Sequence, residues 1–255
     1  LMILRSKFGE AGKRVVVEEF LTGIEMSVFV LTDGRNYIML PEAKDYKRVG
    51  EGDTGLNTGG MGAVSPLPFF DETLRQKVIT RIIEPTIKGI RSEGMDYLGF
   101  IFFGLIVCNG EPLMIEYNCR MGDPETEVVI PRLQNDLVEL FISAARGRLG
   151  DMAASIDPRA AATVVAVSGG YPGEYKKGLP IKGLDQEALE GCMIFQAGTK
   201  DDHGTILTNG GRVLAVTAFG EDIREASELS QYMIEQLHFD DMYYRSDIGF
   251  EFRGQ

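Results

Sequence analysis

The chain has 255 residues, enough to bury a full core as one large domain or two smaller ones. Its composition is globular, with 44% hydrophobic residues, and its formal net charge of −12 argues against a surface built to bind nucleic acid. The sequence has no apolar run long enough to span a bilayer and no recognisable signal peptide, so neither a nucleic-acid nor a membrane partner is expected.

The numbers of cysteines and histidines limit the kinds of functional site that the chain can form. Three widely spaced cysteines without a Cys-x-x-Cys pair predict reduced thiols and a cytoplasmic location. Only two histidines are present, so a zinc site or a His-based triad has almost no material.

The N-terminal part predicts strands joined by tight turns. Residues 14–21 form a β-branched run typical of a buried strand. Residues 26–31 predict a second strand, and an Asp-Gly turn leads to a third over residues 37–41. Residues 44–66 are rich in glycine and lack periodicity, which is typical of a functional loop.

Helices and a strand pair follow. Residues 71–94 predict a helix that begins at an aspartate cap and is irregular near Pro85. Residues 98–107 and 112–117 predict a strand pair turned by Asn-Gly. Residues 134–149 have the apolar spacing of an amphipathic helix.

A domain boundary is expected over residues 150–158. After it we expect strands over 160–168, 193–197, 212–219 and 243–252, a hairpin turn at 209–211, and a helix over 222–237. This order predicts an α+β protein with antiparallel sheets and flanking helices. We expect two domains, residues 1–152 and a smaller mixed α/β domain over 153–255.

Residues 114–127, MIEYNCRMGDPETE, carry the strongest chemical signal. Glu116 and Asn118 end a predicted strand, and side chains two apart on a strand share a face. A carboxylate and an amide oxygen are hard ligands that suit Mg²⁺. Arg120 extends the same face, and Asp123 begins a crowded acidic turn. We interpret this as a metal–phosphate site; a solvated loop is the alternative.

Residues 18–25 allow two interpretations. Glu18 and Glu19 could simply end a strand at the solvent edge. Alternatively, an extended hinge could offer backbone groups to an adenine edge. Phe20 and Leu21 would then supply apolar surroundings, and Glu25 would accept hydrogen bonds from ribose hydroxyls.

Together these two segments resemble the ATP-grasp enzymes, which hold ATP between two α+β lobes and join a carboxylate to a nucleophile. Five motifs in order are similar to the glycinamide ribonucleotide synthetase (phosphoribosylamine–glycine ligase) family: DYKRVGEGDTGLNTGGMGAVSP, RMGDPETE, GGYPGEY, TNGGRVLAVTAFG and YRSDIG. The resemblance runs over residues 12–250. It implies the C-terminal lobe of an ATP-grasp fold followed by the C-terminal domain of the synthetase.

The resemblance also implies roles for particular residues. Glu116 and Asn118 match the family's Mg²⁺ ligands, with Mn²⁺ as an alternative ion. Arg120 falls where related enzymes hold the acyl substrate, and Asp123 is the other catalytic candidate.

For ATP, Glu19 and Leu21 match the hinge positions that read adenine, with Glu18 and Phe20 between and beside them. Glu25 matches the ribose contact.

The loop over residues 54–62 matches the family's glycine-rich substrate loop, whose glycines allow close backbone approach to a ligand. A flexible connector is the alternative. The substrate-binding candidates in this loop are Asn57, Thr58, Gly59, Gly60, Met61 and Gly62.

The implied activity is ATP- and Mg²⁺-dependent ligation of glycine to phosphoribosylamine in purine biosynthesis. It would pass through glycyl phosphate and release glycinamide ribonucleotide, ADP and phosphate. Family members carry upstream domains that bind phosphoribosylamine and grip the ATP phosphates, and no such glycine-rich segment precedes residue 14. The chain is therefore expected to be incomplete, to need those N-terminal domains as partners, and to be inactive alone. The alternatives are another ATP-grasp carboxylate–amine ligase and a non-catalytic fragment.

Some positions depart from the family pattern. Met121 stands where phenylalanine is common, and Glu127 stands where glutamine is common. The strand over 98–107 lacks the acidic metal ligand of many ATP-grasp enzymes. Arg245 and Asp247 are expected to form a structural salt bridge.

Overall fold

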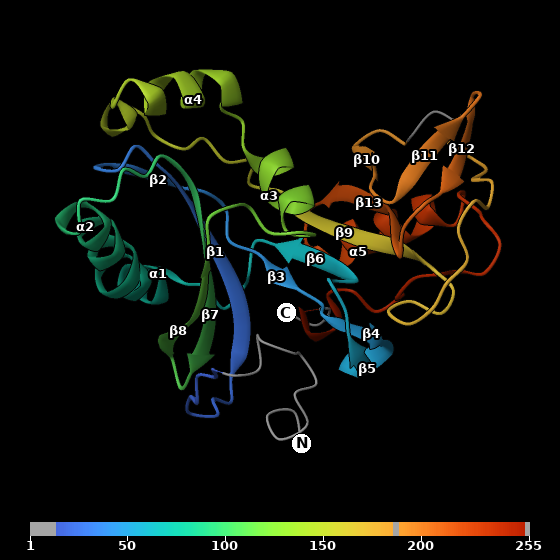
Figure 1. The fold of residues 1–255 in the computed structure, drawn as a ribbon, viewed down its shortest axis with the longest axis horizontal. Coiled ribbons are helices and arrows are strands. Elements are labelled where there is room, and N and C mark those ends of the chain that lie inside the picture. The colour runs from blue at the N-terminus through green and yellow to red at the C-terminus, as the bar shows by residue number, and fades with distance from the viewer. Residues whose placement is uncertain (1–13, 186–188, 253–255) are drawn as a thin grey trace.

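The computed structural model describes residues 14–185 and 189–252. Two antiparallel sheets form its two halves, with helices packed around them (Figure 1). The first sheet has the strand order β2-β1-β7-β8. Its strands are β1 (Ile24–Thr32), β2 (Tyr37–Met39), β7 (Gly99–Cys108) and β8 (Glu111–Asn118).

The strand β1, in the middle of this sheet, is buried on both faces. Along β1, Met26, Val28 and Val30 join one apolar cluster, whereas Phe29 and Leu31 join another. Both faces are covered, which explains an uninterrupted apolar run in place of alternation. The helix α2 (Glu84–Ser92) packs on one face through Ile87, and α4 (Leu137–Ala145) packs on the other through Leu140.

The helices begin at predictable caps. The side chains of Asp71, Asp136 and Asp222 accept hydrogen bonds from backbone amides in the first turns of α1, α4 and α5. A π-helical turn over Ile79–Ile83 confirms the expected irregularity before Pro85. The helices are α1 (Glu72–Val78), α2 (Glu84–Ser92), α3 (Thr126–Arg132), α4 (Leu137–Ala145) and α5 (Ile223–Ile234), with 3₁₀ turns over Glu51–Asp53, Leu149–Asp151 and Phe250–Phe252.

The second sheet has the order β10-β13-β9-β6-β3, with β14 also pairing with β9. Its strands are β3 (Lys44–Asp45), β6 (Gly62–Ser65), β9 (Ala160–Ser168), β10 (Cys192–Gln196), β13 (Arg212–Gly220) and β14 (Met242–Tyr243). The strand β6 pairs with β9 from Gly62↔Val164 to Ser65↔Ala161. This sheet therefore takes strands from both sides of the boundary expected near residue 152, and the division into two domains stays a prediction.

Two hairpins complete the fold. The strands β4 (Arg48–Gly50) and β5 (Thr54–Asn57) lie within the glycine-rich segment, so part of the expected loop has regular structure. The strands β11 (Thr199–Asp202) and β12 (Thr205–Thr208) form the other hairpin, turned at His203. None of the helices in residues 14–185 and 189–252 combines the length and apolar character needed to cross a bilayer.

Three expectations about elements are wrong. Residues 14–21 form no strand and are not buried: Val17 is 90% exposed and Phe20 is 92% exposed. Residues 209–211 do not turn a hairpin, because β12 and β13 lie in different sheets. Of residues 243–252, only Tyr243 belongs to a strand, and the segment instead crosses over the β4–β5 hairpin.

Candidate functional site

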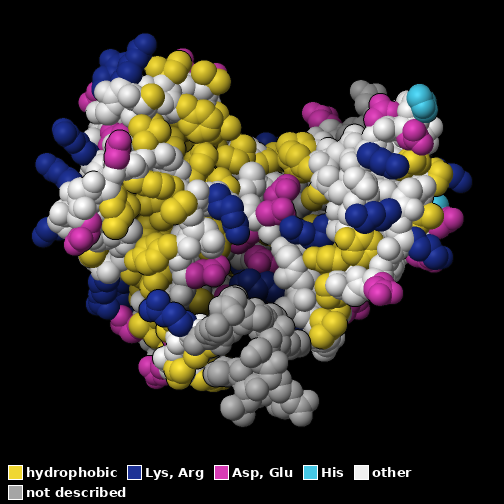
Figure 2. All heavy atoms as spheres, in the orientation of Figure 1, with side chains coloured by type: hydrophobic (Ala, Val, Ile, Leu, Met, Phe, Trp, Pro, Cys, Tyr) yellow, Lys and Arg dark blue, Asp and Glu magenta, His cyan; other side chains and the backbone are white. Residues whose placement is uncertain are grey.

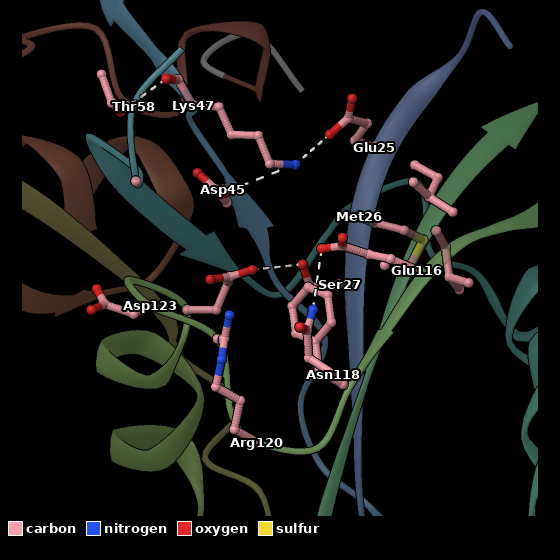
Figure 3. A pocket seen from close by; sticks show the side chains of 17 residues that line it. Glu25, Met26, Ser27, Asp45, Lys47, Thr58, Glu116, Asn118, Arg120 and Asp123 are labelled. Carbon is pink, nitrogen blue, oxygen red and sulfur yellow. Dashed lines mark hydrogen bonds and ion pairs between the residues drawn. The ribbon is translucent and has the colours of Figure 1, made fainter. Parts of the chain in front are cut away.

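A polar pocket of about 430 Å³ opens between the two sheets. Acidic and basic side chains gather where the two halves of the molecule meet (Figure 2). Figure 3 shows Asp45 and Lys47 entering this pocket from one side and Glu116 and Asn118 from the strand opposite. Its lining includes Glu25, Ser27, Asp45, Lys47, Thr58, Gly59, Gly104, Glu116, Asn118, Arg120, Gly122, Asp123 and Glu125.

Glu116 and Asn118 lie on the same face of β8, as their spacing predicts. Asn118 Nδ2 donates a hydrogen bond to Glu116 Oε1 at 3.1 Å, so the two polar groups are side by side. Gly104 of the neighbouring strand gives Glu116 room, because a Cβ there would lie 3.0 Å from Glu116 Cγ. The carboxylate and amide therefore face the pocket together.

A β-bulge changes the character of this strand. Gly104 pairs with Glu116, but the next residue of β7, Leu105, pairs with Met114, so Ile115 is the extra residue. Ile115 lines the polar pocket and also an adjoining pocket of about 420 Å³.

The adjoining pocket brings in the expected hinge segment. Residues 18–21 line it together with Leu113 and Met114 of β8 and Ile106 of β7. Glu25 lines both pockets, so a polar space continues into a largely apolar one. All five residues expected around a nucleotide base and ribose therefore lie beside the strand that carries Glu116 and Asn118.

Arg120 and Asp123 both line the polar pocket, in different surroundings. Arg120 is exposed and donates from Nη1 to the backbone oxygen of Met121 at 2.8 Å. Both carboxylate oxygens of Asp123 accept hydrogen bonds from Arg212, at 2.7 and 2.9 Å. Arg212 Nη1 also donates to the Gly59 carbonyl at 2.7 Å. No spacing pattern in the sequence singles out Arg212 as a site residue, although it stands in the TNGGR motif.

Only part of the expected substrate loop reaches the pocket. Thr58 and Gly59 line it, whereas Met61 is fully buried beside Val165 and Val167. The remaining candidates lie around these residues: Asn57 ends β5 with its side chain exposed, Gly60 packs against Pro124, and Gly62 begins β6.

Three loop amides expected to face a ligand already have acceptors within the protein. The Gly59 amide donates to the Tyr171 hydroxyl at 2.9 Å, and the Gly60 amide donates to Thr58 Oγ1 at 2.9 Å. The Met61 amide donates to the Tyr46 carbonyl at 2.7 Å.

Buried acids form the floor of the pocket. Ser27 Oγ donates to Glu125 Oε1 at 2.7 Å, and the Glu125 side chain is almost fully buried. Burial and the nearby charge of Glu125 raise the pKa of Asp45 to about 8. Outside the pocket lining, burial and the charge of Asp123 likewise raise the pKa of Glu127 to about 7, so this carboxyl is partly neutral near pH 7.

Lys47 supplies a cation at the pocket wall. Its Nζ lies 2.5 Å from Glu25 Oε2 and 3.9 Å from Asp45 Oδ2. Burial acts to lower its pKa, but the hydrogen bond to Glu25 and the charge of Asp45 outweigh that effect and raise it. Asp45 and Lys47 stand two apart in the DYKR motif, a signal of a shared face that could have identified both from the sequence.

Arg245 and Asp247 form the expected salt bridge, with Nε 2.7 Å from Oδ1. Arg245 is fully buried and also contacts Asp53 Oδ1 at 2.7 Å, while Asp247 accepts from the Gly52 amide. The pair fixes the β4–β5 hairpin, and neither residue is among those that line the polar pocket.

Comparisons with known proteins agree with this geometry. The ATP-grasp (A) domain model of phosphoribosylglycinamide synthetase matches residues 2–126, and the C domain model matches residues 161–251. Phosphoribosylamine–glycine ligase of Vibrio cholerae is 46% identical over 250 residues, covering 98% of this chain and 58% of that protein.

Solved structures also resemble this chain. A crystal structure of phosphoribosylamine–glycine ligase from Thermotoga maritima aligns with a TM-score of 0.82 and 36% identity, covering 91% of this chain and 57% of that one. A biotin carboxylase from Campylobacter jejuni aligns with a TM-score of 0.65 at 17% identity, covering 90% of this chain and 49% of that one, a likeness of fold alone.

The paired antiparallel sheets, the pocket between them and these alignments define an ATP-grasp protein of the α+β class. The two domain models together account for most of the chain, which belongs to the phosphoribosylglycinamide synthetase family. The chain spans 58% of the length of the curated relatives that it matches.

Proposed function

We propose that this chain is part of an ATP-dependent ligase that joins glycine to phosphoribosylamine and forms glycinamide ribonucleotide. The observation that carries the proposal is the continuous pair of pockets beside β8. One is apolar and bordered by residues 18–21, and the other is polar and contains Glu116, Asn118 and Arg120. An apolar site for a base that opens into a charged site suits a nucleoside triphosphate.

In this proposal the ATP base lies in the apolar pocket. The backbone of residues 18–21 would read the adenine edge, with Ile115 and Leu113 as apolar neighbours. Glu25 lies where the two pockets meet and would accept hydrogen bonds from the ribose. The phosphates would then extend towards Glu116 and Lys47.

The donor set of β8 fits a hard divalent cation. Glu116 and Asn118 offer oxygen donors on one strand face, and Mg²⁺ prefers oxygen ligands and keeps few protein ligands. The described residues contain no group of three or more His, Cys, Asp or Glu suited to a metal, so phosphate oxygens would complete the coordination. Bound there, Mg²⁺ or Mn²⁺ would offset negative charge on the triphosphate.

The chemistry needs positioning more than side-chain nucleophiles. The glycine carboxylate attacks the γ-phosphorus of ATP and gives glycyl phosphate and ADP. The amine of phosphoribosylamine then attacks the acyl carbon, and phosphate leaves. Arg120 would hold the acyl group, and Lys47 would stabilise the phosphoryl charge. A pocket with no histidine in its lining is compatible with this route.

Asp123 is proposed to have a positioning role and to take no part in the chemical step. Arg212 donates hydrogen bonds to both of its oxygens and to the Gly59 carbonyl. The Asp123–Arg212 pair therefore holds the loop around Gly59 at the edge of the polar pocket. Thr58 and Gly59 are the loop residues proposed to contact substrate.

The complete ligase is proposed to combine this chain with the further region that its relatives possess, which would bind phosphoribosylamine and part of the triphosphate. We propose that this chain alone lacks turnover. A cytoplasmic location is part of the proposal, and the three cysteines are free thiols.

Acid-dependent ADP release by the complete ligase tests the function. With phosphoribosylamine present, glycine should stimulate release, whereas alanine and bicarbonate should not. Stimulation by another acid would favour a different ATP-grasp ligase. Titration of this chain alone with Mg-ATP should give weak binding or none. Turnover by this chain alone would contradict the proposal that the further region of its relatives is required for activity.

A further inference from the structure

Asp45 is a largely buried acid at the polar pocket. Its side chain is only 10% exposed, and its Oδ1 atom has no hydrogen-bond partner among the residues that the structure describes. Lys47 does not satisfy it, because Lys47 Nζ lies 3.9 Å from Oδ2 and 2.5 Å from Glu25. A buried polar atom left without a partner costs about 1–3 kcal/mol, so its presence at a pocket points to a ligand.

Glu125 forms the second half of the same floor. Its side chain is 3% exposed, and Ser27 donates to only one of its oxygens. Asp45 and Glu125 line the same pocket, and after burial the charge of Glu125 is the next cause that raises the pKa of Asp45.

Two glycines leave room for these acids at the pocket. A Cβ on Gly60, whose φ is +114°, would lie 2.3 Å from Pro124 Cδ and 3.2 Å from Asp45 Oδ1. A Cβ on Gly122 would lie 2.4 Å from Glu125 Oε2. Side chains at either position would displace the acids, so the backbone is shaped to keep them at the pocket.

The charge of the pocket indicates what occupies this place. Within the part of the chain that the structure describes, five carboxylates and two cations line it. The carboxylates are Glu25, Asp45, Glu116, Asp123 and Glu125, and the cations are Lys47 and Arg120. Lys47 pairs with Glu25, and Asp123 pairs with Arg212. Asp45 and Glu125 thus lack a full counter-charge, and a small cation able to donate hydrogen bonds fits between them.

The geometry points to Asp45 and Glu125 as the site that binds the α-ammonium group of glycine, while Arg120, which lines the same pocket, would hold the carboxylate. This inference rests on the proposed function. An ammonium group has three N–H donors, enough for the Asp45 carboxylate and for the oxygen of Glu125 that Ser27 does not occupy. The burial of both acids favours a primary amine over a bulkier cation.

Titration of this chain with small probes tests the ammonium site without turnover. The probes are glycine, methylammonium, which keeps only the cation, and glycolate, which keeps only the carboxylate. Asp45→Asn and Glu125→Gln should each weaken glycine and methylammonium binding about tenfold to hundredfold, and should leave glycolate unchanged. Asp240→Asn, an exposed aspartate remote from the pocket lining, is the matched control. Equal binding of methylammonium by wild type and both variants would overturn the assignment.

Kinetics of the complete ligase separate this inference from the proposed function. In Asp45→Asn the KM for glycine should rise by about the same factor, while the KM for ATP stays constant. A higher KM for phosphoribosylamine alone would assign the site to the other amine and overturn the inference. A rise in the Mg²⁺ requirement alone would make it a second metal site and also overturn it. If wild type uses no glycine at all, the proposed function fails instead.

Gly122→Ala provides a second variant. The added methyl would push the Glu125 carboxylate away while leaving both acids in the sequence. Weaker glycine binding with unchanged glycolate binding supports the inference, and unchanged glycine binding opposes it.

Discussion

At the scale of single residues, the buried acids of the pocket lower the folding stability of the chain and serve binding. Asp45 is buried without a full partner, so a neutral side chain at this position should fold better and bind worse. Conflict of this kind marks positions that are shaped by function.

Asp45 gives a pH-dependent prediction. Burial and the charges of Glu125 and Glu25 raise its pKa from 3.8 to about 8 against the opposing charges of Lys47 and Lys44. The unfolded chain ionises Asp45 near pH 4 and the folded chain only near pH 8, so stability falls as the pH rises between these values. Asp45→Asn removes this loss. It should match wild type near pH 4 and exceed it increasingly as the pH rises, by up to about 5 kcal/mol at pH 8, because each unit of pKa shift corresponds to about 1.4 kcal/mol.

Urea unfolding at both pH values measures this difference. Asp240→Asn should track wild type throughout, because its side chain is 80% exposed. A variant whose advantage does not grow with pH would show that Asp45 is ionised normally in the folded chain.

Asn118 tests the metal site. Its only side-chain hydrogen bond in the described structure is to Glu116, so Asn118→Ala should change stability by no more than about 0.5 kcal/mol. In the complete ligase this variant should lose turnover at limiting Mg²⁺, because one oxygen donor is gone. Asn118→Asp keeps an oxygen donor and should recover part of the activity. Turnover that is unchanged at limiting Mg²⁺ would remove Asn118 from the metal site.

At the scale of elements, the strand β8 illustrates what a sequence can reveal. The spacing of Glu116 and Asn118 was enough to predict their shared face. The bulge at Ile115 was not predictable, because it depends on pairing with β7. The exposed state of Val16 and Val17 was missed for a related reason: β-branched residues favour strands, but these have no partner strand among the described residues.

Long-range pairing explains the other misses. Arg212 follows Asp123 by 89 positions, and only the folded chain brings the two together. The side chain of Met61 lies away from the pocket, because the pairing of β6 with β9 places it in a buried cluster with Val165. Motif resemblance identified the right segments, whereas the direction of each side chain within them came from tertiary structure.

The contact between β13 and the pocket mouth gives an element-scale prediction. Arg212 holds Asp123 bidentately and also holds Gly59, so Arg212→Ala should release the loop over residues 57–60. Hydrogen exchange at the Gly59 and Gly60 amides should become at least about tenfold faster, which corresponds to about 1.4 kcal/mol of local stability. Arg224→Ala on α5 is the control, because its guanidinium makes only an exposed 3.8 Å ion pair. Unchanged exchange at both amides would assign Arg212 no positioning role.

At the scale of the whole molecule, the second sheet joins the two expected domains. The strand β9 is buried along its whole length, with β6 on one side and β13 on the other. The α+β class and most of the helices and longer strands were predictable from turns and periodicity. The pairing of β6 with β9 was not, because about 95 residues of sequence separate Ser65 from Ala161 and no local pattern encodes their contact.

This shared sheet predicts that the boundary near residue 152 does not separate independent folding units. A fragment of residues 153–255 would expose the edge of β9 that β6 covers, together with the apolar side chains beneath it. We expect the whole chain to unfold in one transition, and the fragment alone to show no cooperative transition. Because the chain has no tryptophan, far-UV circular dichroism and tyrosine fluorescence serve as the probes. Mixing fragments 1–152 and 153–255 should restore the β6–β9 pairing and the transition. A cooperative transition in fragment 153–255 by itself would show that β9 is stable without β6, and would support two separately folding domains.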